Sequence, residues 1–191
     1  ANNLDYHSSA IDLAKVYENL DKGQLAIKYR LVSISILENS IKSSKMLKLL
    51  ATDYANISHV YRNKMSDGEN AVLYAKKAVR IKEKFPLDQY YGIALYHLAR
   101  ALDFDKQYFE AADTYKKSLS FINVKSTKQL FQKLVIELNL GLCLSNLNID
   151  ESKKMLTHVL KEFKKSEITN YVTKEIQHRI DLAYKILSGT K

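Results

Sequence analysis

Apolar residues recur three or four positions apart along almost the whole chain, which is the spacing of one face of an α-helix. No stretch alternates apolar and polar residues for long enough to form a strand. The pattern therefore predicts an all-α protein with nine helices and no sheet. The predicted helices cover residues 4–20, 24–39, 45–64, 70–85, 88–104, 107–122, 127–147, 150–165 and 167–188.

Short breaks join these helices in pairs. Gly23 separates the first two helices, and the sequence SDG at 66–68 is a turn signal between the third and the fourth. Pro86 ends the fourth helix, because the residue before a proline is pushed out of the helical region. We therefore expect four helix hairpins followed by one terminal helix. The hairpins cover residues 4–40, 45–85, 88–122 and 127–165, and the terminal helix covers 167–188.

The four hairpins repeat one pattern. Each first helix places a small residue directly after an apolar one, and each second helix carries another small residue near its start. Small residues on both arms let two helices approach closely where they cross. In the first helices these residues are Ala14, Ser58, Ala99 and Gly141, which are 44, 41 and 42 positions apart. In the second helices they are Ala26, Ala71, Ala111 and Ser152.

The repeat resembles the tetratricopeptide repeat (TPR). The family's consensus spacing is matched best in the third hairpin, by Leu98, Ala99, Leu102, Tyr108, Ala111, Tyr115 and Leu119. In the first hairpin it is matched by Leu13, Ala14, Tyr17 and Ala26. The repeats are longer than the family's usual period of about 34 residues. In this they are similar to the long-repeat members found in bacterial sensory and peptide-receptor proteins.

The resemblance implies a right-handed α-solenoid whose first helices line a concave groove and whose terminal helix caps the array. Family members mostly bind peptides or partner helices in that groove and are rarely enzymes. We therefore expect residues 1–191 to form a single repeat domain without catalytic activity. The chain begins at Ala1, and we expect it to be a piece of a larger signalling or transcription-regulatory protein.

The family's groove-facing positions can be carried onto each first helix. They recur two places before, one place after and five places after the small residue, and asparagine is frequent among them. Asparagine is a mediocre helix former, but its amide can pair with a peptide backbone. Asn19, Asn63 and Asn146 are equally compatible with solvated helix ends. The predicted groove residues are Asp12, Lys15, Asn56, His59, Arg62, Asn63, Tyr96, His97, Arg100 and Asn139.

Basic side chains at these positions predict a partner that is acidic. Lys15, Arg62 and Arg100 would suit a peptide carboxylate or acidic side chains. The family's carboxylate clamp is not reproduced, because Ser8 and Thr52 stand where it needs other residue types. Two aromatic residues are candidates for an apolar pocket that takes one anchor side chain, namely Tyr96 and Phe104.

The net charge of +9 raises nucleic-acid binding as the alternative function. Residues 1–100 carry 15 basic and 10 acidic groups, and residues 101–191 carry 15 and 11. An excess spread this evenly differs from the clustered footprint of a nucleic-acid site, which makes nucleic acid the less favoured partner.

Other classes of site leave no mark in the sequence. No apolar run approaches the roughly 20 residues of a membrane span. Cys143 is the only cysteine, so no internal disulfide can form, and we expect a reducing, cytoplasmic setting. No phosphate loop or zinc-protease motif occurs, and we expect neither a metal nor a cofactor. The terminal helix could also pack against a second copy, which leaves a homodimer possible.

Overall fold

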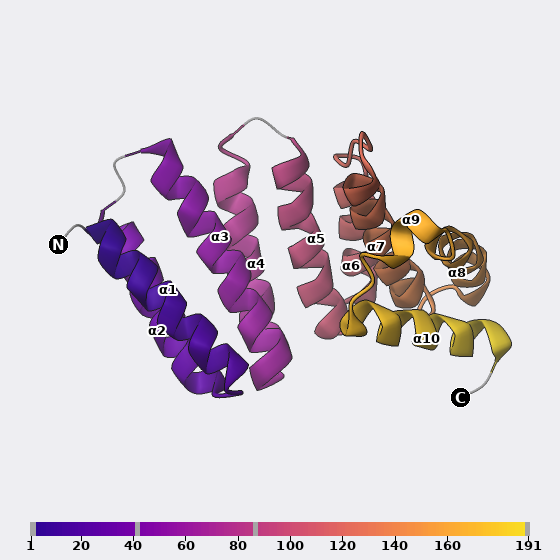
Figure 1. Cartoon of the computed structure of the whole chain (residues 1–191), viewed down its shortest axis with the longest axis horizontal. Helices are drawn as coiled ribbons and strands as arrows, with labels where there is room; N and C mark the ends of the chain where they lie inside the picture. The colour runs from indigo at the N-terminus through magenta and orange to yellow at the C-terminus, as the bar shows by residue number, and fades with distance from the viewer. Residues whose placement is uncertain (1–2, 41–42, 86–87, 190–191) are drawn as a thin grey trace.

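The computed structural model describes residues 3–40, 43–85 and 88–189, and in these residues the regular structure is entirely helical (Figure 1). A single π-helical turn, η1 (Tyr61–Met65), continues the third helix. The α-helices are α1 (Asn3–Asn19), α2 (Gly23–Glu38), α3 (Ser44–Val60), α4 (Gly68–Lys82), α5 (Gln89–Phe104), α6 (Tyr108–Leu119), α7 (Thr127–Leu144), α8 (Ile149–Phe163), α9 (Ser166–Thr169) and α10 (Lys174–Ser188).

Local capping explains where most of these helices begin. Six of them start after a residue whose side-chain oxygen accepts a hydrogen bond from a backbone N–H two or three positions further on. Such a bond satisfies one of the donors that the first helical turn leaves unpaired. The capping residues are Ser43, Asp67, Asp88, Ser126, Asn148 and Thr173.

The helices pack as four hairpins, α1 with α2, α3 with α4, α5 with α6 and α7 with α8, which stack in chain order. This arrangement confirms the predicted all-α solenoid of four hairpins. Its apolar core runs along the array as successive clusters, two of which draw residues from adjacent hairpins, while the third joins the last hairpin to α9 and α10. Each repeat therefore depends on its neighbours to bury its apolar surface, as in other solenoids.

The small residues lie at the helix crossings, as predicted. Ala14 and Ala99 are fully buried. A Cβ atom on Gly141 would lie 2.6 Å from Cδ2 of Leu156, which leaves no room for a larger residue there. The hydroxyl of Ser152 donates a 2.7 Å hydrogen bond to the Gly141 carbonyl on the facing helix. The same positions thus bring the arms close together and also bond them.

The C-terminal segment differs from its prediction. A single helix was expected over 167–188, but the chain forms the short α9, a connection over 170–173, and then α10. The break is stabilised locally, because Thr173 caps α10 by accepting a hydrogen bond from the Ile176 backbone N–H. The apolar spacing continues through the break, which is why periodicity alone did not reveal it. Pro86, expected to end the fourth helix, lies outside the described residues.

Helix α10 covers the end of the array. Its apolar residues Ile176, Ile180 and Ala183 pack with residues of α7 and α8. In Figure 1 the first turn of α10 lies beside the C-terminal end of α5, and the helix extends from there away from α5, steeply inclined to it. None of the described helices is long and apolar enough to cross a membrane.

Candidate partner-binding groove

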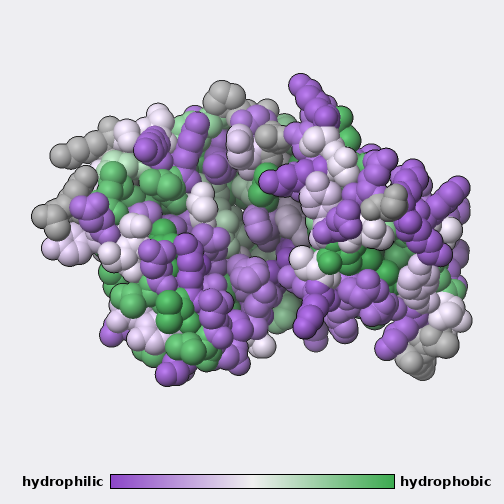
Figure 2. Space-filling view, in the orientation of Figure 1, coloured by the Kyte–Doolittle hydropathy of each residue, from purple (hydrophilic) through white to green (hydrophobic). Residues whose placement is uncertain are grey.

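A cavity of about 390 Å³ opens where η1, α5, α6, α7 and α10 meet. We call it the arginine pocket, because three arginines from three different elements line it. Its charged lining residues are Arg62, Arg100, Asp103, Glu175 and Arg179, and His178 also lines it. Figure 2 shows that this face of the molecule is hollowed near its middle, with hydrophilic residues around the hollow.

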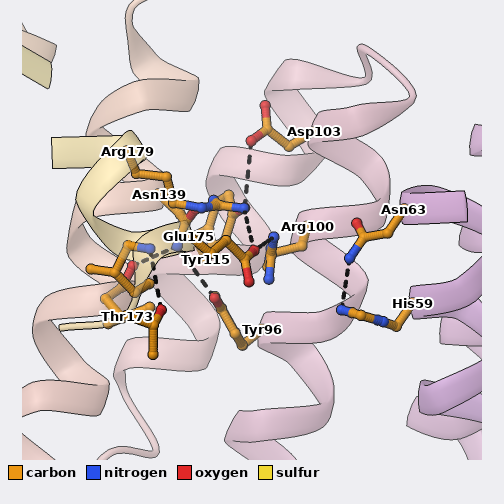
Figure 3. A network of polar contacts seen from close by, with 12 residues as sticks. His59, Asn63, Tyr96, Arg100, Asp103, Tyr115, Asn139, Thr173, Glu175 and Arg179 are labelled. Atoms are coloured by element: carbon orange, nitrogen blue, oxygen red, sulfur yellow. Dashed lines mark hydrogen bonds and ion pairs between the residues drawn. The ribbon is translucent and has the colours of Figure 1, made fainter. Parts of the chain in front are cut away.

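Two of the arginines converge on one carboxylate. Arg100 Nη2 lies 2.8 Å from Glu175 Oε1, and Arg179 Nη2 lies 3.2 Å from the same oxygen (Figure 3). The guanidinium of Arg100 also lies over the ring of Tyr96, 5.8 Å from its centroid. Burial alone would raise the pKa of Glu175, but Arg100 and Arg179 outweigh it and bring the pKa below its usual value. Glu175 is therefore ionised at neutral pH.

The third arginine, Arg62, has no such partner. Arg62 is only 7% exposed, and its side chain makes no hydrogen bond or ion pair within the described part of the chain. Burial, together with the neighbouring charges of Arg100 and Arg179, lowers the pKa of Arg62 to about 10. Arg62 lies in η1, and π-helical turns occur frequently at functional sites. The arrangement favours an anion beside Arg62.

Asparagines line part of this pocket but are already hydrogen-bonded within the chain. Asn139 is almost fully buried, and its Nδ2 donates to the Val135 carbonyl at 2.6 Å and to the Tyr96 hydroxyl at 3.3 Å. Its Oδ1 is buried without a partner among the described residues. Asn63 Nδ2 lies 2.7 Å from His59 Nε2. The predicted asparagine positions therefore do not present a uniform row of free amides.

A second, smaller cavity of about 220 Å³ lies between α5 and α7. Tyr96 and His97 line it together with apolar residues that include Ile93 and Phe131. Burial lowers the pKa of His97 to about 4, with Arg100 and Arg62 adding to the effect, so His97 is neutral at pH 7. We call this cavity the apolar pocket. Phe104 lines the arginine pocket instead, so the two aromatic residues lie in different cavities.

The remaining predicted groove residues lie outside both pockets. Asp12 and Lys15 are exposed on α1 and pair with each other at 3.3 Å. Asn56 is half-buried on α3 and lines neither cavity. The structure thus brings together Arg62, Asn63, Arg100 and Asn139 in one pocket, with His59 bonded to its rim.

Sequence reasoning missed the contribution of α10. Glu175, His178 and Arg179 are not among the predicted groove residues. Their spacing of three and four residues places them on one helix face, which is the only local signal. Among the described residues, no group of three or more His, Cys, Asp or Glu side chains could hold a metal ion.

Similar solved structures are TPR-like repeat proteins. A protein from Podosopora anserina assigned as a kinesin light chain, with nearly identical TPR-like repeats, has a TM-score of 0.70 and 17% identity over 95% of this chain and 87% of its own. A point variant of it has a TM-score of 0.72 and 16% identity over 95% and 86%. BtubC (BKLC) from P. vanneervenii has a TM-score of 0.58 and 12% identity over 98% and 85%.

These likenesses confirm, at the level of fold, the TPR resemblance inferred from the sequence. No protein-family model matches the chain, and no curated protein matches it. At these identities the comparisons show the shared fold alone.

Proposed function

We propose that this chain is a protein-binding scaffold that binds an extended, acidic segment of a partner protein on its hollowed face. The observation that carries the proposal is Arg62, an almost fully buried residue whose guanidinium reaches an open pocket and has no partner among the described residues. A buried charge without a hydrogen-bond partner costs free energy. A carboxylate bound beside Arg62 would offset this cost through short, charge-assisted hydrogen bonds.

The neighbouring apolar pocket supports an extended ligand. Tyr96 belongs to that pocket, and it also contacts Arg100 and Asn139 of the arginine pocket. The two cavities therefore adjoin through one side chain. A segment with an acidic side chain and an apolar side chain a few residues away would fill both, with the apolar residue as its anchor.

We further propose that the chain acts without catalysing a reaction. Burial, together with the charge of Asp103, raises the pKa of the Cys143 thiol to about 12, so the only cysteine of the chain is a poor nucleophile. The long repeats support a place in a cytoplasmic signalling or transcription-regulatory protein, by resemblance to sensory and peptide-receptor proteins. Nucleic acid remains the alternative ligand because of the net charge.

Fluorescence anisotropy with labelled acidic peptides tests the proposal. We expect an amidated hexaglutamate peptide to bind, and amidated hexaglutamine to bind far more weakly. Arg62→Gln should weaken hexaglutamate binding roughly tenfold or more, as expected for loss of a charged hydrogen bond. Arg80→Gln is the matched control, because Arg80 is exposed on α4 and lines neither pocket.

Two results would contradict the proposal. The first is equal affinity of Arg62→Gln and the unchanged chain for hexaglutamate. The second is preferential binding of a short single-stranded RNA with an affinity that collapses between about 50 and 200 mM salt, which would favour the nucleic-acid alternative.

A further inference from the structure

The first turn of α10 already places a carboxylate among the three arginines. We propose that Glu175 is a resident, displaceable ligand of a carboxylate site formed by Arg62, Arg100 and Arg179, and that the carboxylate of a partner takes its place. This inference rests on the proposed function, since it concerns the same pocket. It adds that the chain's own terminal helix competes with the partner for the same guanidinium groups.

Glu175 uses only part of what the site offers. Both of its hydrogen bonds, from Arg100 and from Arg179, end on the single oxygen Oε1. Neither hydrogen bond involves Arg62. The Nε atom of Arg100 is also buried without a hydrogen-bond partner in the described residues. A partner's carboxylate could therefore make hydrogen bonds that Glu175 leaves unmade. These additional bonds would let the partner's carboxylate bind the arginines more strongly than Glu175 does.

The resident carboxylate is also easy to remove. Its side chain is 54% exposed, whereas that of Arg100 is 11% exposed, so Glu175 reaches the site from the solvent side. Ion pairs of exposed carboxylates contribute little to stability, because water replaces the lost contact. The exchange of one carboxylate for another would therefore cost little.

Displacement of Glu175 does not require α10 to leave the array. The helix is anchored by Ile176, Ile180 and Ala183, which pack with α7 and α8. Only the first turn, next to the Thr173 cap, carries Glu175. A bound partner would thus release that turn, and by reciprocity any change that releases the turn would strengthen binding of the partner.

The charge-removing substitution Glu175→Gln tests this competition in the full 191-residue chain. We expect its affinity for amidated hexaglutamate to rise roughly five-fold above that of the unchanged chain, because the internal competitor is lost. Glu110→Gln is the matched control, since Glu110 is a similarly exposed, ion-paired glutamate on α6 outside the pocket. It changes the net charge equally and should leave the affinity almost unchanged.

A second pair of peptides distinguishes the two sources of a carboxylate. Hexaglutamine with a free C-terminus offers a terminal carboxylate only, whereas amidated hexaglutamate offers side-chain carboxylates only. Whichever of the two binds should bind Glu175→Gln more tightly, and amidated hexaglutamine should show no such gain. Thermal unfolding of both variants by circular dichroism checks that their folds are intact.

The outcomes separate the two proposals. If hexaglutamate binds the unchanged chain but Glu175→Gln binds it equally or more weakly, the proposed function stands and the competition is overturned. If Glu110→Gln gains as much as Glu175→Gln, the effect is general electrostatics and the competition is again overturned. If no carboxylate peptide binds any variant better than amidated hexaglutamine, the proposed function itself fails.

Discussion

Arg30 in the first hairpin and Arg62 at the end of α3 are both almost fully buried, at 4% and 7% exposure, yet their surroundings differ. Arg30 donates from Nε and Nη2 to Glu18 Oε1 at 2.9 and 2.7 Å. Arg62 has no partner among the described residues and opens into a cavity. A buried arginine that forms an ion pair within its own hairpin supports the fold. A buried arginine that faces a pocket and has no ion-pair partner is available to a ligand.

The same contrast extends to other polar groups of the two halves. In the N-terminal half, Asp53 Oδ2 lies 2.9 Å from His7 Nε2. The same oxygen accepts a 2.6 Å hydrogen bond from the hydroxyl of Ser33, and all three side chains are buried. In the C-terminal half, Arg100 Nε and Asn139 Oδ1 are buried without hydrogen-bond partners among the described residues. One nitrogen of Arg30, Nη1, is also buried without a hydrogen-bond partner among the described residues, but Arg100 and Asn139 differ from Arg30 in lining the arginine pocket.

The largest expected effect comes from breaking the matched pair. Arg30→Met removes the guanidinium and leaves Glu18 without its partner in a largely buried position. We expect the free energy of unfolding to fall by about 3 kcal/mol, because the carboxylate loses its compensation while staying out of water. Urea denaturation followed by circular dichroism measures the change. A loss below about 1 kcal/mol would mean that Arg30 is not a structural ion-pair residue.

A smaller effect is expected from His97, which lies beside the arginines and makes no hydrogen bond within the described residues. Burial lowers its pKa from 6.5 to about 4, so between these values the unfolded chain binds a proton that the folded chain does not. His97 therefore contributes stability that is fully present above pH 6.5 and is lost as the pH falls towards 4. The contribution should reach about 2 kcal/mol, less than the full pKa shift would give, because His97 is only half-buried and water screens its surroundings.

The variant His97→Gln isolates this contribution. Its unfolding free energy should fall less than that of the unchanged chain between pH 6.5 and pH 4, as followed by urea denaturation at several pH values. His178→Gln is the control, because His178 is exposed on α10. Parallel pH profiles for His97→Gln and the unchanged chain would show that His97 is not held neutral by its surroundings.

The repeat pattern was readable in the sequence because its causes are local. Small residues such as Ala99 and Gly141 recur at the crossings, and capping residues such as Asp67 and Asn148 mark the helix starts. Carrying the family's groove positions onto the chain also selected Arg100, and Arg62 was included as a basic residue further along the helix of Ser58.

The rest of the pocket could not be predicted, because it depends on where α10 packs. The break over 170–173 changes the direction of the last helix, and this brings Glu175 and Arg179 to Arg100, far away in the sequence. The spacing of apolar residues in the sequence does not predict where α10 packs against the other helices. The exposed pair of Asp12 and Lys15 does not line the arginine pocket, since equivalent repeat positions need not face one cavity, and its place in a groove stays a prediction.

Arg62→Met tests the central comparison most directly. Methionine keeps the apolar volume and removes a buried charge that no described residue compensates, so we expect the free energy of unfolding in urea to rise by about 1 kcal/mol. A change in the free energy of unfolding opposite in sign to that of Arg30→Met, measured under the same conditions, would show that Arg62 lowers stability. That result would fit a residue whose role is to bind a ligand. A destabilisation similar to that of Arg30→Met would contradict the account, because it would mean that Arg62 supports the fold.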